Sequence, residues 1–386
     1  MQAVAVAAIE SARGFVLSKL ARLLLLPLMV GIRSAQAKTQ VEVLTNVISQ
    51  TGGSGKQVYD NSGNENMTLI EPEVFIESVI SPETTVTGRA VMDSWTSASV
   101  KAFDTNTGVS TRGTKSESRT AAYFSLTQKF EPITITPSLG YSSETAYDSL
   151  SAGLSLSKGF AENCFTVSVD YLHFEDSVQN WDLNTDKLTG KMPKRTDTVS
   201  VGASQILTPS DIVYVGVEES AQAGFLSTSR NTVNVNGTRV YEVVPSSRFR
   251  SAYYARGVHG FNDILAAHLD YRFYNDNWSI SAHSIEPSLA ASLGEEHEGL
   301  IRVFYRFHTQ TATEYYQPQF SAPAPYMTSD SDLSAFSANE VGLQGSWRFD
   351  RTGAISFISV GGGFVYYVRS NDLAIAAAQV NLTAGF

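Results

Sequence analysis

The chain has 386 residues, with 28 lysines and arginines against 38 aspartates and glutamates. Charged residues make up 17% of the chain and aromatic residues 11%, which excludes a disordered protein, because disorder needs many charges and few aromatic residues. The formal charge of −10 argues against nucleic-acid binding, which needs a basic surface. A single cysteine excludes an internal disulfide framework and thiolate metal clusters.

The N-terminus has the features of a secretory signal peptide. Basic residues precede an apolar run over residues 23–32, and residues 35–37 (Ala-Gln-Ala) form a small-x-small cleavage site. The run spans about ten residues, too few to cross a bilayer as a helix. We therefore expect residues 1–37 to be removed on export and residues 38–386 to form one domain.

After residue 37 the hydrophobic pattern has a period of two, which is typical of β-strands. At the C-terminus, every second residue from Ala374 to Phe386 is apolar, while Gln379, Asn381 and Thr383 alternate with them. Residues 265–273 and 301–307 repeat the pattern. Alternation alone also fits a soluble β-sandwich.

Three features favour a transmembrane barrel over a sandwich. Many alternating segments are about ten to twelve residues long, the length that a tilted strand needs to cross a bilayer. Their polar face carries charged residues at mid-strand, as a wet lumen allows. Aromatic residues gather near the predicted strand ends, as in an interfacial girdle: Phe130, Tyr141, Tyr171, Trp278, Trp347, Phe349 and Phe386.

Bacterial barrels have short periplasmic turns, long external loops and an even number of strands. Short turns are predicted at 81–84, 131–132, 158–162, 208–211, 275–277 and 350–353, and long connections at 51–66, 97–117, 174–196, 219–262, 287–297 and 321–337. Fourteen clear strands lie between these connections. With only these strands, however, a short turn would lie outside the cell and a long connection in the periplasm, against the length rule. Adding strands at 39–49 and 313–320 restores it. We therefore predict an all-β, antiparallel up-and-down barrel of about 16 strands, with 14 or 18 as alternatives and both termini in the periplasm.

The predicted external loop 219–262 has structure of its own. Residues 232–241 read as a hairpin, because Asn236-Gly237 is a strong type I′ turn signal between valine-rich segments. If this hairpin joined the sheet, the barrel would have 18 strands. The loop also carries five arginines that outnumber its acids: Arg230, Arg239, Arg248, Arg250 and Arg256. Two interpretations follow: a solvated outer hairpin, or a lid or basic segment folded into the lumen.

Several of these segments resemble a known family. Tyr271-Arg272-Phe273-Tyr274 with Trp278, then Tyr305-Arg306, together with Gly224-Phe225-Leu226, are similar to the outer-membrane barrel family described as domain of unknown function 3570. The resemblance covers most of the chain after residue 37 and is sharpest over 224–316. It implies a barrel in the outer membrane of Gram-negative bacteria. It implies no established activity and supplies no catalytic residues.

Alternation assigns the candidate lumen residues. The predicted pore lining consists of Glu71, Glu73, Glu77, Arg89, Asp93, Asp270, Arg272, His283, Arg302, Arg306 and His308. Three acids stack on the strand at 68–80, and Arg302 and Arg306 stack on the strand at 299–310. Facing rows of opposite charge would create a transverse field across the lumen. The alternative is that each row is neutralised locally, for instance Glu77 by Arg89, or by arginines of the loop 219–262 packed inside the barrel.

Two patterns in the sequence are candidates for a catalytic or metal-binding site. If a four-residue turn at 275–278 sets the register, Asp270 faces His283, and nearby serines would complete a hydrolase-like group. Lipase signatures such as Gly-x-Ser-x-Gly are missing, so an Asp–His–Arg network in the lumen wall is favoured. Residues 295–298 (Glu-Glu-His-Glu) carry cation-binding side chains, but contiguous residues rarely converge on one ion. We therefore predict no enzyme activity, no cofactor and no bound metal.

The function best supported by these patterns is a porin-like channel for small polar solutes. The alternative is a non-transporting scaffold or sheath for another envelope protein, for example a redox protein, and an outer-membrane hydrolase ranks third. Expected contacts are outer-membrane lipid and, through basic loops, lipopolysaccharide phosphates. Phe386 resembles the terminal signal read by the outer-membrane assembly machinery. Nucleic acid is not an expected partner.

Overall fold

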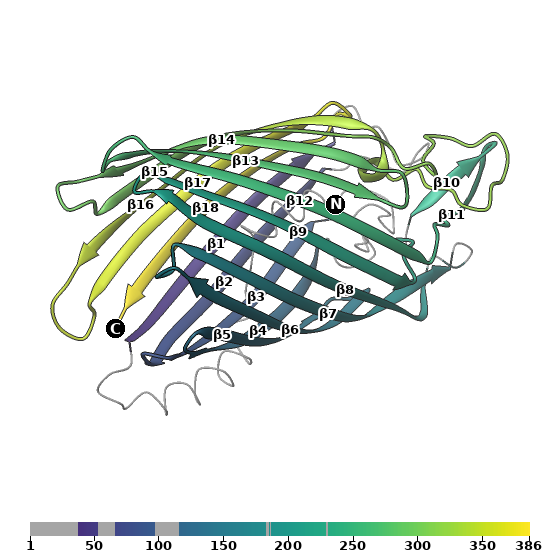
Figure 1. Cartoon of the computed structure of the whole chain (residues 1–386). Coiled ribbons are helices and arrows are strands. Elements are labelled where there is room, and N and C mark those ends of the chain that lie inside the picture. The colour runs from purple at the N-terminus through teal and green to yellow at the C-terminus, as the bar shows by residue number, and fades with distance from the viewer. Residues whose placement is uncertain (1–37, 53–65, 97–115, 183–184, 186, 229–230) are drawn as a thin grey trace.

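The computed structural model describes residues 38–52, 66–96, 116–182, 185, 187–228 and 231–386. Sixteen antiparallel strands close into one barrel, and a separate two-stranded hairpin stands outside the ring (Figure 1). The predicted strand number is confirmed, and the hairpin does not enlarge the ring to 18. The predicted signal peptide at 1–37 lies outside the described residues.

The barrel strands are β1 (Lys38–Thr51), β2 (Met67–Ser81), β3 (Thr84–Thr96), β4 (Ser116–Phe130), β5 (Ile133–Ser143), β6 (Tyr147–Phe160), β7 (Phe165–Asp182), β8 (Lys187–Thr208), β9 (Asp211–Gly224), β12 (Ser247–Gly260), β13 (Leu265–Asp276), β14 (Ser281–Leu293), β15 (Gly299–Gln310), β16 (Phe336–Asp350), β17 (Phe357–Arg369) and β18 (Ala374–Gly385). The hairpin is β10 (Thr232–Val235) with β11 (Thr238–Tyr241). A single turn of 3-10 helix, η1 (Ser331–Leu333), precedes β16. No helix in these described parts of the chain is long and apolar enough to cross a membrane.

The first and last strands close the ring. β1 pairs with β18 from Gln40 opposite Gly385 to Thr51 opposite Ala374, and the Phe386 amide donates to the Thr39 carbonyl at 2.8 Å. Each barrel strand therefore has a hydrogen-bonded neighbour on both sides, as a sheet in lipid requires. Because the strand number is even, both described chain ends lie at the same end of the barrel.

Connections differ between the two ends of the barrel. The end that holds both chain ends has short turns, such as 82–83, 131–132 and 209–210, and we call it the short-turn end. The opposite, long-loop end carries the segments 225–246 and 311–335. Figure 1 shows the β10–β11 hairpin beyond this long-loop end, far from the C-terminus. This asymmetry agrees with the length rule of bacterial barrels.

Two strand assignments from the sequence are wrong. Residues 247–260 were placed in the loop 219–262 but form β12, a barrel strand between β9 and β13. Residues 313–320 were placed in the ring but lie in an irregular loop. The two errors compensate in the strand count, but they reverse the direction of the strands between them. The predicted periplasmic turn near 275–277 therefore lies at the long-loop end, and the 295–298 segment lies at the short-turn end.

The two faces of the sheet differ as the alternation predicts. Val43, Leu139, Val215, Val303 and Val380 are among many apolar side chains that are exposed on the outer face. Five of the seven predicted girdle aromatics are exposed near strand ends: Phe130, Tyr141, Trp347, Phe349 and Phe386. Tyr171 is exposed as well but lies well inside β7, opposite Leu154 and Val199. Trp278 is buried, since it is only 3% exposed. An apolar outer face over a polar interior is the pattern of a membrane-spanning barrel.

This facing assignment predicts unequal costs for the same substitution on adjacent residues. Leu269 is half-exposed on the outer face, while His268 points to the lumen. Leu269→Arg should lower folding stability by about 2–4 kcal/mol, because it places a charge against lipid at mid-strand. His268→Arg, the matched control, should cost much less. Urea titrations of folding into lipid vesicles measure both, and equal losses would contradict the facing.

Candidate functional site

The lumen wall holds the candidate functional site. Residues directly opposite each other in the ladder share a face, so the register places every predicted pore-lining residue except His283 on the inner face: Glu71, Glu73, Glu77, Arg89, Asp93, Asp270, Arg272, Arg302, Arg306 and His308. Glu71, Glu73 and Asp93 are buried within this wall. The alternation of hydrophobic residues was sufficient to orient these side chains.

His283 does not line the pore. The connection between β13 and β14 covers 277–280, and Asn275 pairs with Ser281, so Asp270 lies opposite Glu286. His283 pairs with Phe273 on the outer face, where its Nδ1 is 2.7 Å from the Tyr271 hydroxyl. A shift of register by one residue moves a whole strand to the other face. The predicted Asp270–His283 pair, and with it the hydrolase-like group, is therefore wrong.

Charges on β2 and β3 are paired within the wall. Arg89 Nε lies 2.6 Å from Glu73 Oε1, and Arg119 on β4 lies 2.5 Å from Asp93. The Glu71 carboxylate accepts a hydrogen bond from Asn46 Nδ2 at 2.9 Å. The predicted partner of Arg89 was Glu77, and the structure gives Glu73 instead. Local neutralisation therefore operates, between different residues from those expected.

A second charged network crosses β12 to β16. Glu286 binds both Arg302 at 2.7 Å and Arg306 at 2.6 Å, and Arg306 also reaches Glu340 at 3.4 Å. Arg256 on β12 forms an ion pair with Asp270 on β13. Arg302 and Arg306, both predicted from the sequence, are thus bridged by Glu286. The sequence did not predict Glu286 as a lumen residue, because the predicted register placed it on the outer face of β14.

Sequence reasoning missed β12 as a source of lumen residues. Arg248, Arg250 and Arg256 all face inward, whereas Phe249 and Tyr253 are about half-exposed on the outer face. The predicted basic segment folded into the lumen is therefore not what the structure shows. The arginines reach the lumen on a strand of the wall and not on a folded-in loop. The alternation in 248–256 was the signal that could have identified this strand.

The lumen charges separate into two halves of the ring. Eight arginines face inward from β12 to β17, and we call them the arginine wall: Arg248, Arg250, Arg256, Arg272, Arg302, Arg306, Arg348 and Arg369. Five carboxylates share these strands: Asp270, Asp276, Glu286, Glu340 and Asp350. The described wall from β1 to β9 reverses the balance, with nine acids (Glu42, Glu71, Glu73, Glu77, Asp93, Asp170, Asp176, Asp182 and Glu218) against six bases (Lys38, Arg89, Arg119, Lys129, Lys187 and Lys194).

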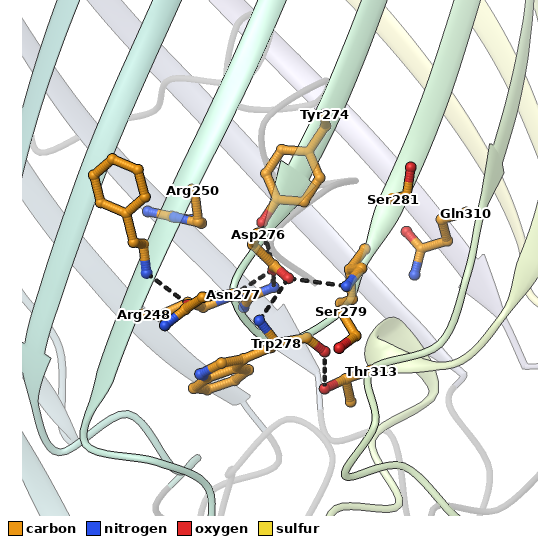
Figure 2. Close-up of polar contacts among 12 residues, drawn as sticks. Arg248, Arg250, Tyr274, Asp276, Asn277, Trp278, Ser279, Ser281, Gln310 and Thr313 are labelled. Carbon is orange, nitrogen blue, oxygen red and sulfur yellow. Dashed lines mark hydrogen bonds and ion pairs between the residues drawn. The ribbon is translucent and has the colours of Figure 1, made fainter.

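At the long-loop end, Asp276 organises the rim of the arginine wall. Figure 2 shows this carboxylate among Arg248, Tyr274 and the backbone of the following turn. It accepts from Arg248 Nε at 2.9 Å, from the Tyr274 hydroxyl at 2.8 Å, and from the amide of Trp278 at 3.0 Å. The Trp278 ring is buried here, with its Nε1 donating to the Ser247 carbonyl at 3.0 Å. Trp278 therefore anchors the rim and does not belong to the girdle.

The segments 225–246 and 311–335 pack together into one unit, which we call the cap. Its core contains Val233 and Val235 of β10 with Phe320 and Met327 of the second segment. The hydroxyl of Thr328 donates to the buried Glu242 carboxylate at 2.6 Å. The cap is joined to the wall where Arg369 Nη1 meets Asp332 at 2.5 Å.

The 295–298 segment lies in the turn between β14 and β15. The Glu296 amide donates to Glu298 Oε2 at 3.1 Å, and His297 Nδ1 is 3.0 Å from Ser292 Oγ. No group of three or more His, Cys, Asp or Glu side chains in the described chain is arranged to hold a metal ion.

A closed barrel with an apolar outer face and a charged lumen is a transmembrane β-barrel. The chain belongs to the family described as protein of unknown function (DUF3570), which matches residues 105–384. No curated protein matches it.

Several solved outer-membrane proteins resemble the fold. A bacterial polysaccharide outer membrane secretin shares 6% identity at a TM-score of 0.50, over 90% of this chain and 98% of that chain. OccK1 (OpdK) of Pseudomonas aeruginosa shares 6% identity at a TM-score of 0.45, over 91% and 98% of the two chains. OccAB1 of Acinetobacter baumannii shares 9% identity at a TM-score of 0.44, over 91% and 97%. At these identities the likeness concerns the fold alone.

The buried glutamate predicts that the stability of the cap depends on pH. Burial raises the pKa of the Glu242 carboxyl to about 7, and the nearby charge of Asp330 adds to the shift. The folded cap thus holds a proton that the unfolded segment releases, so its stability should fall by about 1–3 kcal/mol as the pH rises from 4.5 to 7. Amide exchange protection factors of β10 and β11 measure this stability.

Glu242→Gln should remove most of this pH dependence, since the amide is neutral throughout and the Thr328 hydroxyl can accept from it. Glu314→Gln, at an exposed glutamate of the same cap, is the matched control and should behave as the wild type. An unchanged pH profile in Glu242→Gln would contradict the assignment.

Proposed function

We propose that this protein is a passive, porin-like channel for small polar solutes in the bacterial outer membrane, with its short-turn end in the periplasm. A ring of 16 strands is wide enough for an aqueous channel. The inner faces of β5, β6 and β8 carry small residues, among them Thr134, Ser138, Ser151, Ser155, Ser200 and Ser204. Such side chains leave the interior of the ring to water and solute.

The observation that carries this proposal is the position of the inward aromatic rings. Tyr214 lies across two glycines of neighbouring strands, and a Cβ added at Gly202 or Gly216 would come within 2.7 Å of its hydroxyl. Phe304 covers Gly342 in the same way. Because these large rings lie flat against the wall, they do not extend into the lumen. Rings that lie along the wall favour an open channel over an interior filled with side chains.

Exposure of charged lumen residues also supports an aqueous interior. The inward Arg256 side chain is 57% exposed, and Arg302 and Arg306 are 31% and 29% exposed although both are ion-paired. A dry interior would leave such charges heavily desolvated. The excess of arginine on one half and of carboxylate on the other supports a transverse field that orients dipolar solutes.

Ion selectivity tests the proposed channel. The double variant Arg302→Ala with Arg306→Ala leaves Glu286 and Glu340 without these arginines. The reversal potential in a KCl gradient should therefore shift in the direction of greater cation selectivity. The double variant Glu71→Ala with Glu73→Ala removes the partner of Arg89 and should shift the reversal potential in the direction of greater anion selectivity. Each shift should shrink as ionic strength rises, because salt screens the wall charges. Planar-bilayer recordings of the purified barrel measure both.

A matched control uses Gly257→Ala, on the outer face, where an added Cβ meets no atom within 4 Å. This variant should conduct as the wild type does. A wild-type barrel without conductance would contradict the channel and favour the alternative, a scaffold or sheath for another envelope protein.

A further inference from the structure

Two residues of the arginine wall differ from the rest. Six of the eight have a carboxylate within ion-pair distance: Arg248, Arg256, Arg302, Arg306, Arg348 and Arg369. Among the described side chains, Arg250 and Arg272 have none. Arg250 is enclosed at the rim, where its Nη2 donates to Ser220 at 3.1 Å. Arg272 lies deeper in the lumen, at the middle of β13.

The surroundings of Arg272 leave only one part of its guanidinium available. Its Nε donates to the Tyr254 hydroxyl at 3.2 Å. The rings of Tyr254 and Tyr274 lie 5.4 and 5.3 Å from the guanidinium carbon, within cation–π distance. With Nε bonded and both rings close by, the terminal Nη1 and Nη2 groups remain. They form the fork that binds a carboxylate through two parallel hydrogen bonds.

The residues that lie in line with Arg272 on the next two strands, β14 and β15, are polar and carry no carboxylate. Arg272 lies opposite Ser284, and Ser284 lies opposite His308, with Ser284 Oγ 2.8 Å from His308 Nδ1. His308 is close enough to Arg272, Arg306 and Arg369 to interact with the charge of all three. An anion at this position would therefore meet cations and hydrogen-bonding groups.

The nearest acids on the same strand are already neutralised. Asp270, two residues before Arg272, is paired with Arg256, and Asp276 is paired with Arg248. Figure 2 shows Tyr274 next to Asp276 on the side of the deeper wall, and Arg250 on the neighbouring strand, where it pairs with Asp276 in the register. The positive charge of Arg272 is thus not cancelled by a carboxylate of the described wall.

We propose that Arg272 is the recognition residue of an anion subsite in the lumen, where its Nη1–Nη2 fork binds the carboxylate of a small organic anion beside Tyr254 and Tyr274. This inference rests on the proposed channel and names its solute class. Arginine suits this role better than lysine, because a planar fork matches a carboxylate and an ammonium does not.

Binding of benzoate to the detergent-solubilised barrel tests the subsite without any need for transport. Saturation-transfer NMR should detect benzoate but not neutral benzamide at equal concentration. Arg272→Gln should weaken benzoate binding about tenfold or more, because two charge-assisted hydrogen bonds are lost. Arg272→Lys, which keeps the charge, should recover only part of the affinity. Inorganic phosphate should compete with benzoate if anion charge alone is recognised, which would overturn the carboxylate assignment.

Arg348→Gln is the matched control, with the same charge change near the short-turn end, and its benzoate affinity should equal that of the wild type. Equal losses in Arg272→Gln and Arg348→Gln, or no loss in Arg272→Gln, would overturn the subsite. Failure of the subsite and failure of the channel are distinguishable. A conducting barrel without Arg272-dependent benzoate binding overturns only the subsite. A non-conducting barrel that still binds benzoate through Arg272 overturns only the channel.

Discussion

Closure of the ring between β1 and β18 is the constraint on which the rest of the structure depends. A sheet in lipid cannot leave backbone groups unpaired, so the last strand must return to the first. Closure fixes the inner and outer face of every strand, because successive side chains alternate. Apolar residues are therefore confined to the outside and charged residues to the lumen. The chemistry of the lumen therefore follows directly from which residues of each strand point inward.

Charge within the lumen is balanced locally but separated across the ring. Ion pairs such as Arg89 with Glu73 and Arg306 with Glu286 make the buried charges tolerable, since an unpaired charge in a low-dielectric wall is costly. The remaining excess is positive from β12 to β17 and negative from β1 to β9. Arg272 contributes to the positive side with no described carboxylate within ion-pair distance, and tyrosine rings flank its guanidinium.

Much of the fold could be predicted from the sequence because period-two alternation is a local signal. The facing of Leu269 and His268 follows from it, as does the hairpin at Asn236-Gly237, where both residues have positive φ. The signal failed where composition misled. Residues 247–260 alternate as a strand, but their arginines and their position after the hairpin suggested a loop. The strand at 313–320 was predicted only to satisfy the length rule of the connections, and Phe320 packs instead into the cap.

Residue pairs across strands were harder to predict than facing. The turn after β13 is fixed by Asp276, which accepts from the amides of Trp278 and Ile280, and nothing in the alternation indicates that turn. An error of this kind moved His283 into the lumen and left Glu286 out of it. The charged network of the site therefore required the register, which only the three-dimensional structure provides.

The central claim is that the lumen is wet and carries opposite charge on its two halves. Cysteine reactivity tests it most directly, in a Cys164→Ser background that removes the only native cysteine. Ser284→Cys lies beside Arg272, and Leu44→Cys lies opposite Glu73. Anionic and cationic methanethiosulfonates should modify both positions, with a higher anionic-to-cationic rate ratio at position 284 than at position 44. Equal ratios at the two positions, or no modification at either, would contradict the account.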